Sequence, residues 1–274
     1  MFRVRLRLSP ASFPRLQTFR ILRYDPLSGG KPHMEDFTVN LDECGPMILD
    51  ALIHVKDRID PSLSFRRSCR EGICGSCSVN VEGKNVLACL TYIQVRKKPI
   101  DIRPLPHTYI LKDLVPDLSN FYNSHRAVEP WLQRRHPQPA SAKQEILQSK
   151  QDRARLDGLY ECILCACCST ACPPYWWNEE SYLGPAALLQ AYRWISDSRD
   201  QMTSERLAWL NDSMRLYRCH NIQNCTDACP KHLDPAGAIV KIKELLAPGH
   251  PPVRDQTEQV TGHFNRNRSG LSMS

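Results

Sequence analysis

Eleven of the 13 cysteines in this chain fall into three regularly spaced groups, and no other feature constrains the fold as strongly. The first group reads C-x4-C-x2-C with a distant fourth cysteine. The second reads C-x2-C-x2-C-x3-C-P. The third repeats the second pattern with Ile222 where one cysteine is expected. The groups are, in order, Cys69, Cys74, Cys77 and Cys89; Cys162, Cys165, Cys168 and Cys172; and Cys219, Cys225 and Cys229.

These spacings are typical of iron-sulfur proteins. The first is the plant-type ferredoxin spacing for [2Fe-2S], and the second is the bacterial ferredoxin run. Structural zinc is the main alternative, but zinc sites usually join two separate C-x2-C pairs across a longer loop. In the first group, Gly72 and Gly75 let the backbone turn tightly, so that amide N–H groups can point at sulfur.

The ligands of the second and third groups follow from a rule for two-cluster ferredoxins, in which the fourth cysteine of each run binds the other cluster. The chain then divides into one [4Fe-4S] set of Cys162, Cys165, Cys168 and Cys229 and a second set of Cys172, Cys219 and Cys225. The second set has only three thiolates, and Ile222 offers no lone pair. This site is therefore predicted to be [3Fe-4S], with a potential suited to a terminal acceptor.

Length and composition favour a globular protein of two domains. The chain has 274 residues, of which 42% are apolar and 24% charged, and no apolar run reaches the 18 residues of a membrane span. No signal-peptide core is evident at the start, so the cysteines point to a reducing compartment and not to a disulfide framework. The net charge of +7 is spread without a basic run, and no nucleic-acid partner is expected.

The N-terminal part shows the pattern of a β-grasp ferredoxin. Alternating residues predict strands at 18–24 and 37–41, a helix from Pro46 to Ile59, a hairpin at 79–88 and a strand at 100–102. One helix packed on strands, with a cysteine loop at the edge, fits that fold.

The C-terminal part has helical periodicity almost throughout. Helices are expected from Ser141 to about Leu156, from Gly184 to Ile195, from Leu207 to Tyr217 and from Asp234 to Leu246. The fold class is thus α+β, a plant-type [2Fe-2S] domain followed by an all-α two-cluster ferredoxin domain. The predicted divisions are a basic arm or presequence remnant at 1–16, the first domain at 17–125, a linker at 126–140, the helical domain at 141–248 and a tail at 249–274.

Three stretches around the cysteines closely resemble the iron-sulfur subunits of succinate dehydrogenase, respiratory complex II. They are SFRRSCREGICGSC at 64–77, ECILCACCSTACPPYWWN at 161–178 and RCHNIQNCTDACPK at 218–231. The resemblance extends over about residues 17–247. It implies an FAD-containing flavoprotein partner that oxidises succinate, and membrane-anchor subunits that bind ubiquinone, often with haem b. Electrons would pass from FAD through [2Fe-2S], [4Fe-4S] and [3Fe-4S] to ubiquinone.

The resemblance also implies a ubiquinone site made by Pro173, Trp176, Trp177, His220 and Ile222. An indole N–H can donate to a quinone carbonyl while its ring packs on the apolar body, and Trp177 is the expected donor. Alternatively, Trp176 only anchors the subunit on its membrane partners, and His220 is an ordinary surface histidine. Residues 216–218, Leu-Tyr-Arg, resemble a signal that is read by iron-sulfur assembly chaperones.

The location follows from the same reasoning. The first 24 residues hold six arginines and no acidic residue, the composition of a mitochondrial presequence. The expected place is the matrix side of the mitochondrial inner membrane, with the cytoplasmic side of a bacterial plasma membrane as the alternative. Quinol:fumarate reductase and a non-catalytic zinc module are the alternative functions. Cys44 and Cys167 are expected to be free, and the tail to pack on a membrane subunit.

Overall fold

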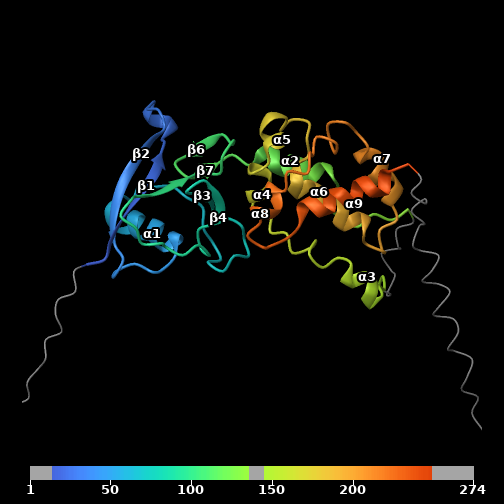
Figure 1. Cartoon of the computed structure of the whole chain (residues 1–274), viewed down its shortest axis with the longest axis horizontal. Coiled ribbons are helices and arrows are strands. Elements are labelled where there is room, and N and C mark those ends of the chain that lie inside the picture. The colour runs from blue at the N-terminus through green and yellow to red at the C-terminus, as the bar shows by residue number, and fades with distance from the viewer. Residues whose placement is uncertain (1–13, 136–144, 249–274) are drawn as a thin grey trace, which may run out of the picture.

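The structure is a computed structural model and describes residues 14–135 and 145–248. Strands fill one half of the molecule and helices the other (Figure 1). The predictions for the start of the arm, for Ser141 as a helix cap and for the tail at 249–274 concern positions outside the described residues.

The strand half is a β-grasp, as predicted. Its five-stranded sheet has the order β2-β1-β5-β3-β4, with β1 and β5 parallel and the other pairs antiparallel. The strands are β1 (Leu16–Arg23), β2 (His33–Asn40), β3 (Ser78–Val81), β4 (Lys84–Leu87) and β5 (Ile100–Arg103). A short helix η1 (Pro26–Ser28) lies between β1 and β2, and β6 (Ile110–Lys112) pairs with β7 (Val115–Pro116) in a second, small sheet.

The core of this half follows from alternation along β1. Phe19 and Ile21 are fully buried, and Phe19 pairs with the buried Phe37 of β2. Helix α1 (Ile48–His54) buries its apolar side against the sheet and continues into a π turn, η2 (Val55–Ile59), so the helix predicted from Pro46 to Ile59 is confirmed within two residues. The apolar residues that alternate along the strands and those that recur every 3.6 residues along α1 therefore pack into one common core.

Three of the six N-terminal arginines belong to this folded half. Arg15 and Arg20 form exposed ion pairs with Asp42 and Asp36, respectively. Arg23 is buried and pairs with Asp113 at 3.1 Å, and the same carboxylate accepts the Ser64 amide at 2.8 Å. This buried pair fixes the chain just before the first cysteine loop. The prediction of a mitochondrial presequence therefore depends on the three arginines before residue 14.

The helical half contains short helices around the cysteine runs and longer ones behind them. The elements are α2 (Ser119–Ala127), α3 (Lys150–Ala154), α4 (Cys167–Thr170), α5 (Pro173–Trp177), α6 (Gly184–Ile195), α7 (Thr203–Leu210), α8 (Asn224–Asp227) and α9 (Pro235–Leu246). Helices α6 and α9 pack together at the centre of this half (Figure 1). Their buried residues form its core, and both agree with the predicted bounds.

Two predicted helices are shorter than expected. Helix α3 begins at Lys150, because the Ser149 hydroxyl caps it by accepting the amide of Asp152. Helix α7 ends at Leu210 and does not reach Tyr217. There the Asp212 carboxylate accepts the amides of Met214 and Arg215, a local turn that competes with helical hydrogen bonding.

The segment that connects the two halves is held against the helical half. Helix α2 runs across position 125, the predicted domain boundary, and its Asn120 donates to Tyr175. The buried Arg206 donates to the carbonyls of residues 128, 129 and 131 and pairs with Asp200 at 2.9 Å. The first part of the predicted linker is therefore ordered by buried hydrogen bonds.

The two halves share one continuous core, which contains residues of the sheet, of α1 and of the cysteine runs. At their junction the buried Asn85 of β4 donates to the Cys167 carbonyl and to the Thr170 hydroxyl, each at 3.0 Å. Its own amide oxygen accepts from Asn80. A buried amide with all partners present specifies one arrangement of the halves. Among the described helices, none has the length and apolarity required to cross a bilayer.

Candidate iron-sulfur cluster sites

The first cysteine set lies in a loop built to hold thiolate. The Cys69 sulfur accepts amide N–H groups from Glu71 at 3.5 Å and from Ile73 and Cys74 at 3.3 Å. These hydrogen bonds lower the pKa of Cys69 to about 6. The loop is thus arranged for negative charge on sulfur, which a [2Fe-2S] cluster carries.

The partners of Cys69 complete this set. Cys77 and Cys89 are both buried, and the Cys89 amide donates to the Cys77 sulfur at 3.5 Å. Burial raises the pKa of Cys77 to about 12, so cluster binding must release its proton. Cys74 lies between Cys69 and Cys77 in sequence, and its sulfur accepts the Ser76 amide at 3.5 Å. All four predicted ligands of the first set therefore lie in one neighbourhood.

The second and third cysteine runs have the same backbone conformation. Leu164 and Ala166 in one run, and Asn221 and Gln223 in the other, have φ between 53° and 70°. A one-turn helix follows each, α4 in the first run and α8 in the second. Left-handed conformations cost a non-glycine residue of the order of 1 kcal/mol, so this repetition marks a functional loop.

In this repeat, Ile222 stands at the position that Cys165 occupies in the first run. Both residues lie between two left-handed residues. Their surroundings differ, because Cys165 is 9% exposed and Ile222 is 51% exposed. The missing cysteine is thus a replacement within an intact loop and not a change of loop length.

Four cysteines from both runs line one cavity. It is lined by Cys162, Cys165, Cys168 and Cys229 and by apolar residues such as Leu189 and Leu233. Within the described residues, no three His, Cys, Asp or Glu side chains meet where one metal ion would fit. The four cysteines instead line a shared space. Burial raises the pKa of Cys168 and Cys162, and a bound cation would favour their thiolate forms.

The remaining three cysteines form the third set. Cys225 is buried and lies close to Cys172 and Cys219. Burial raises the pKa of Cys225 to about 12. The hydroxyl of Tyr182 is also buried beside this set, within hydrogen-bonding reach of the Cys219 and Cys172 thiols, and it has no nitrogen or oxygen partner among the described residues.

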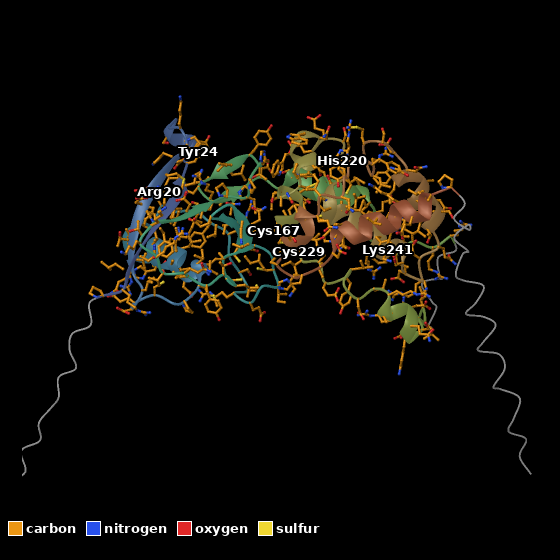
Figure 2. The ribbon with its side chains drawn as sticks, viewed as in Figure 1. Arg20, Tyr24, Cys167, His220, Cys229 and Lys241 are labelled. Carbon is orange, nitrogen blue, oxygen red and sulfur yellow. The ribbon has the colours of Figure 1, made fainter. Side chains whose placement is uncertain are left out.

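These observations fit iron-sulfur clusters. The first set provides amide donors to sulfur, the second lines a partly apolar cavity with four cysteines, and the third has three thiols with a buried hydroxyl donor beside them. Each of these is what a sulfide-rich, negatively charged group requires. Figure 2 shows Cys167 and Cys229 near the junction of the halves, with His220 on the helical half.

The residues predicted to bind quinone differ in their surroundings. Trp176 stacks on His107 with ring centroids 4.0 Å apart, and its indole N–H donates to the Thr170 carbonyl at 2.6 Å. Trp177 is 73% exposed. His220 and Ile222 are also exposed, whereas Pro173 is half-buried at the start of α5. Only one indole of the tryptophan pair thus keeps its donor for a ligand.

The remaining sequence predictions concern the Leu-Tyr-Arg motif and the two cysteines outside the three groups. In the Leu-Tyr-Arg motif, Leu216 is fully buried, whereas Tyr217 and Arg218 are exposed. Cys44 and Cys167 are not disulfide-bonded, and Cys167 is fully buried. Tyr182 and His107 could not be recognised from the sequence as parts of these sites, because a lone aromatic residue or histidine carries no spacing signal.

A β-grasp with a plant-type cysteine loop, followed by a helical unit with two cysteine runs, defines an iron-sulfur electron-transfer protein. Residues 18–123 match the family described as 2Fe-2S iron-sulfur cluster binding domain, and residues 161–234 match the 4Fe-4S dicluster domain. The chain is 61% identical, over 84% of its length and 82% of the relative's, to succinate dehydrogenase (ubiquinone) iron-sulfur subunit 1, mitochondrial, of Oryza sativa subsp. japonica.

Two solved structures share the fold. One is a chain of the Mycobacterium smegmatis Sdh1 complex in the apo form, with a TM-score of 0.74, 24% identity, and coverage of 88% of this chain and 100% of that chain. The other is a hypothetical protein from Helicobacter pylori, with a TM-score of 0.50, 14% identity, and coverage of 89% and 42%.

The chain belongs to the succinate dehydrogenase iron-sulfur subunit family. It is a subunit of an oxidoreductase complex and carries electrons through iron-sulfur clusters. The predicted α+β class and the two cluster domains are confirmed. Membership of this family supports the predicted function in succinate dehydrogenase. It does not support the two alternative functions, quinol:fumarate reductase and a zinc module.

Proposed function

We propose that the chain holds three clusters. The ligands are Cys69, Cys74, Cys77 and Cys89 for [2Fe-2S]; Cys162, Cys165, Cys168 and Cys229 for [4Fe-4S]; and Cys172, Cys219 and Cys225 for [3Fe-4S]. The observation that carries this assignment is the cavity lined by Cys229 together with three cysteines of the other run. It supports the exchange of fourth ligands that the spacing predicts.

When bound, such clusters accept and release one electron at a time. The chain's own residues hold the thiolates in place, exclude water from the second set and keep the first two cysteine loops in contact. A cavity of about 400 Å³ is lined by both Cys74 and Cys165, so the two loops face each other directly. This contact supports an electron path from the first set to the second.

The third set is the proposed outlet to ubiquinone. Trp177 is the proposed hydrogen-bond donor, because its indole is exposed while that of Trp176 is bonded to Thr170. Pro173, His220 and Ile222 complete the proposed site. Trp176 would then act through packing on His107, which agrees with an anchoring role.

The subunit works in mitochondria as a peripheral component at the inner membrane. We place it on the matrix side, between an FAD-containing flavoprotein subunit and membrane-anchor subunits that bind ubiquinone with or without haem b. Iron-sulfur assembly chaperones are proposed to load it. The proposed units are residues 17–125 and 141–248 with a connection at 126–140, an arm at 1–16 and a tail at 249–274.

The test is EPR spectroscopy of the assembled complex. The oxidised complex should show a three-iron signal, and stepwise reduction should reveal the [2Fe-2S] and [4Fe-4S] signals. A complex with two four-iron clusters and no three-iron signal would refute the assignment of the third set. A colourless protein without iron would refute the whole proposal.

A further inference from the structure

Tyr182 is a buried tyrosine whose hydroxyl lies beside the third cysteine set. Its side chain is 1% exposed, so water does not reach the oxygen. Among the described residues, no nitrogen or oxygen atom is a partner of this oxygen, and the groups within hydrogen-bonding reach are the thiols of Cys219 and Cys172. A buried hydroxyl in a native protein needs a hydrogen-bond acceptor, and here sulfur supplies it.

The surroundings of this hydroxyl identify the chemistry of that partner. Cys172 and Cys219 pack against the core that contains Tyr182, and Cys225 lies close by, so the complete third set surrounds this hydroxyl. The ring packs edge-on against Tyr175, with centroids 6.5 Å apart, inside the core that α6 and α9 build. A rigid aromatic core therefore holds the hydroxyl beside three sulfurs.

The neighbouring tyrosine shows the contrast. The Tyr175 hydroxyl accepts a hydrogen bond from the Asn120 amide at 3.2 Å, so its oxygen has a partner within the protein. Tyr175 and Tyr182 are both buried and belong to the same core. Tyr175 thus has an amide partner, whereas the acceptors that surround the Tyr182 hydroxyl are sulfur atoms.

We propose that the Tyr182 hydroxyl donates a hydrogen bond to a sulfur atom of the cluster held by Cys172, Cys219 and Cys225, and thereby raises its reduction potential. The inference rests on the proposed three-iron cluster. A reduced cluster carries one more negative charge than an oxidised one, so a donor to sulfur stabilises the reduced form. Tyr182 is thus a tuning residue for the last electron step within the subunit.

The experiment compares Tyr182→Phe with Tyr175→Phe in the assembled complex. Each change removes one oxygen and keeps the ring. A redox titration followed by the three-iron EPR signal should show a lower potential for Tyr182→Phe, by about 59 mV for a tenfold shift in a one-electron equilibrium. Tyr175→Phe should leave this potential unchanged. Equal potentials in Tyr182→Phe and the parent would overturn the inference.

Two further outcomes keep the inference separate from the proposed function. A parent complex without a three-iron signal would refute the cluster assignment itself, and the inference with it. If Tyr182→Phe fails to assemble, the unaltered complex can be prepared with ring-deuterated tyrosine. Pulsed EPR on its three-iron signal should then detect coupled deuterium. The absence of that coupling would overturn the inference, because the ring would lie too far from the cluster.

Discussion

The two cysteine runs of the helical half have the same backbone and opposite surroundings. Both place two left-handed residues around a central position and then begin a one-turn helix. In the first run that position is Cys165, which faces the β-grasp half. In the second it is Ile222, which faces solvent. Local sequence therefore determines the loop, while the environment and one side chain determine what the loop can hold.

This difference also indicates a direction for electron transfer through the chain. The first run contacts the loop of the first cysteine set, whereas the second run carries the exposed Ile222, on the same half as the exposed Trp177. An inward-facing run suits transfer within the subunit, and an outward-facing run suits exchange with a separate carrier.

The substitution Ile222→Cys should abolish the difference between the runs. A fourth thiolate at the position equivalent to Cys165 should convert the three-iron site to a four-iron one, because the loop already has the required conformation. The oxidised three-iron EPR signal should disappear, iron content should rise by one atom per subunit, and quinone reduction should slow. Ile222→Val is the control. An unchanged three-iron signal in Ile222→Cys would refute the equivalence of the two positions.

The outward direction is tested by Trp177→Leu. Loss of one hydrogen bond to a quinone, worth about 1.4 kcal/mol, should lower quinone reduction about tenfold. Succinate oxidation with an artificial acceptor should be retained. Trp131→Leu, another exposed tryptophan of the helical half, is the matched control. Equal losses in both assays would indicate faulty assembly instead of a quinone contact.

The inward direction is tested at Gly75. A Cβ atom there would lie 3.0 Å from Cys165 Cα and from the Ile163 carbonyl, whereas a Cβ at Gly83 meets nothing within 4 Å. Both glycines have positive φ, so Gly75→Ala and Gly83→Ala share a backbone strain of about 1 kcal/mol. Only Gly75→Ala should push the first two cysteine loops apart.

The readout for this pair is the magnetic coupling between the two reduced clusters, which falls steeply with distance. Gly75→Ala should weaken the dipolar broadening in the EPR spectrum of the reduced complex, and Gly83→Ala should match the parent. Identical broadening in all three proteins would show that Gly75 does not set the approach of the loops.

The smallest predicted effect concerns how each run is anchored. Thr226 of the second run donates to Asp234 at 2.8 Å, and the same carboxylate oxygen caps α9 by accepting the Gly237 amide at 2.9 Å. The equivalent Ser169 of the first run has no partner among the described residues. Asp234→Ala should cost about 1 kcal/mol and lower the temperature of cluster bleaching by about 2–4 °C. Asp234→Asn retains a cap and should behave as the parent.

The sequence predicted what depends on spacing and periodicity. Alternation around Phe19 and Phe37 was enough for the β-grasp strands, and cysteine spacing was enough for the cluster domains. The end of α7 was missed, because a helical apolar pattern continues to Tyr217 while the Asp212 carboxylate stops the helix. Contacts between distant segments, such as Gly75 with Cys165 and Tyr182 with the third set, have no periodic signal and required the fold.

The complete burial of Leu216 has a consequence for biogenesis. A loading factor that reads the Leu-Tyr-Arg signal through this side chain can do so only while the surrounding helices are still open. Closure of the core withdraws the leucine and leaves the tyrosine and arginine outside. Folding would then end recognition by the loading factor, because the same step that completes the core of the subunit also buries the leucine.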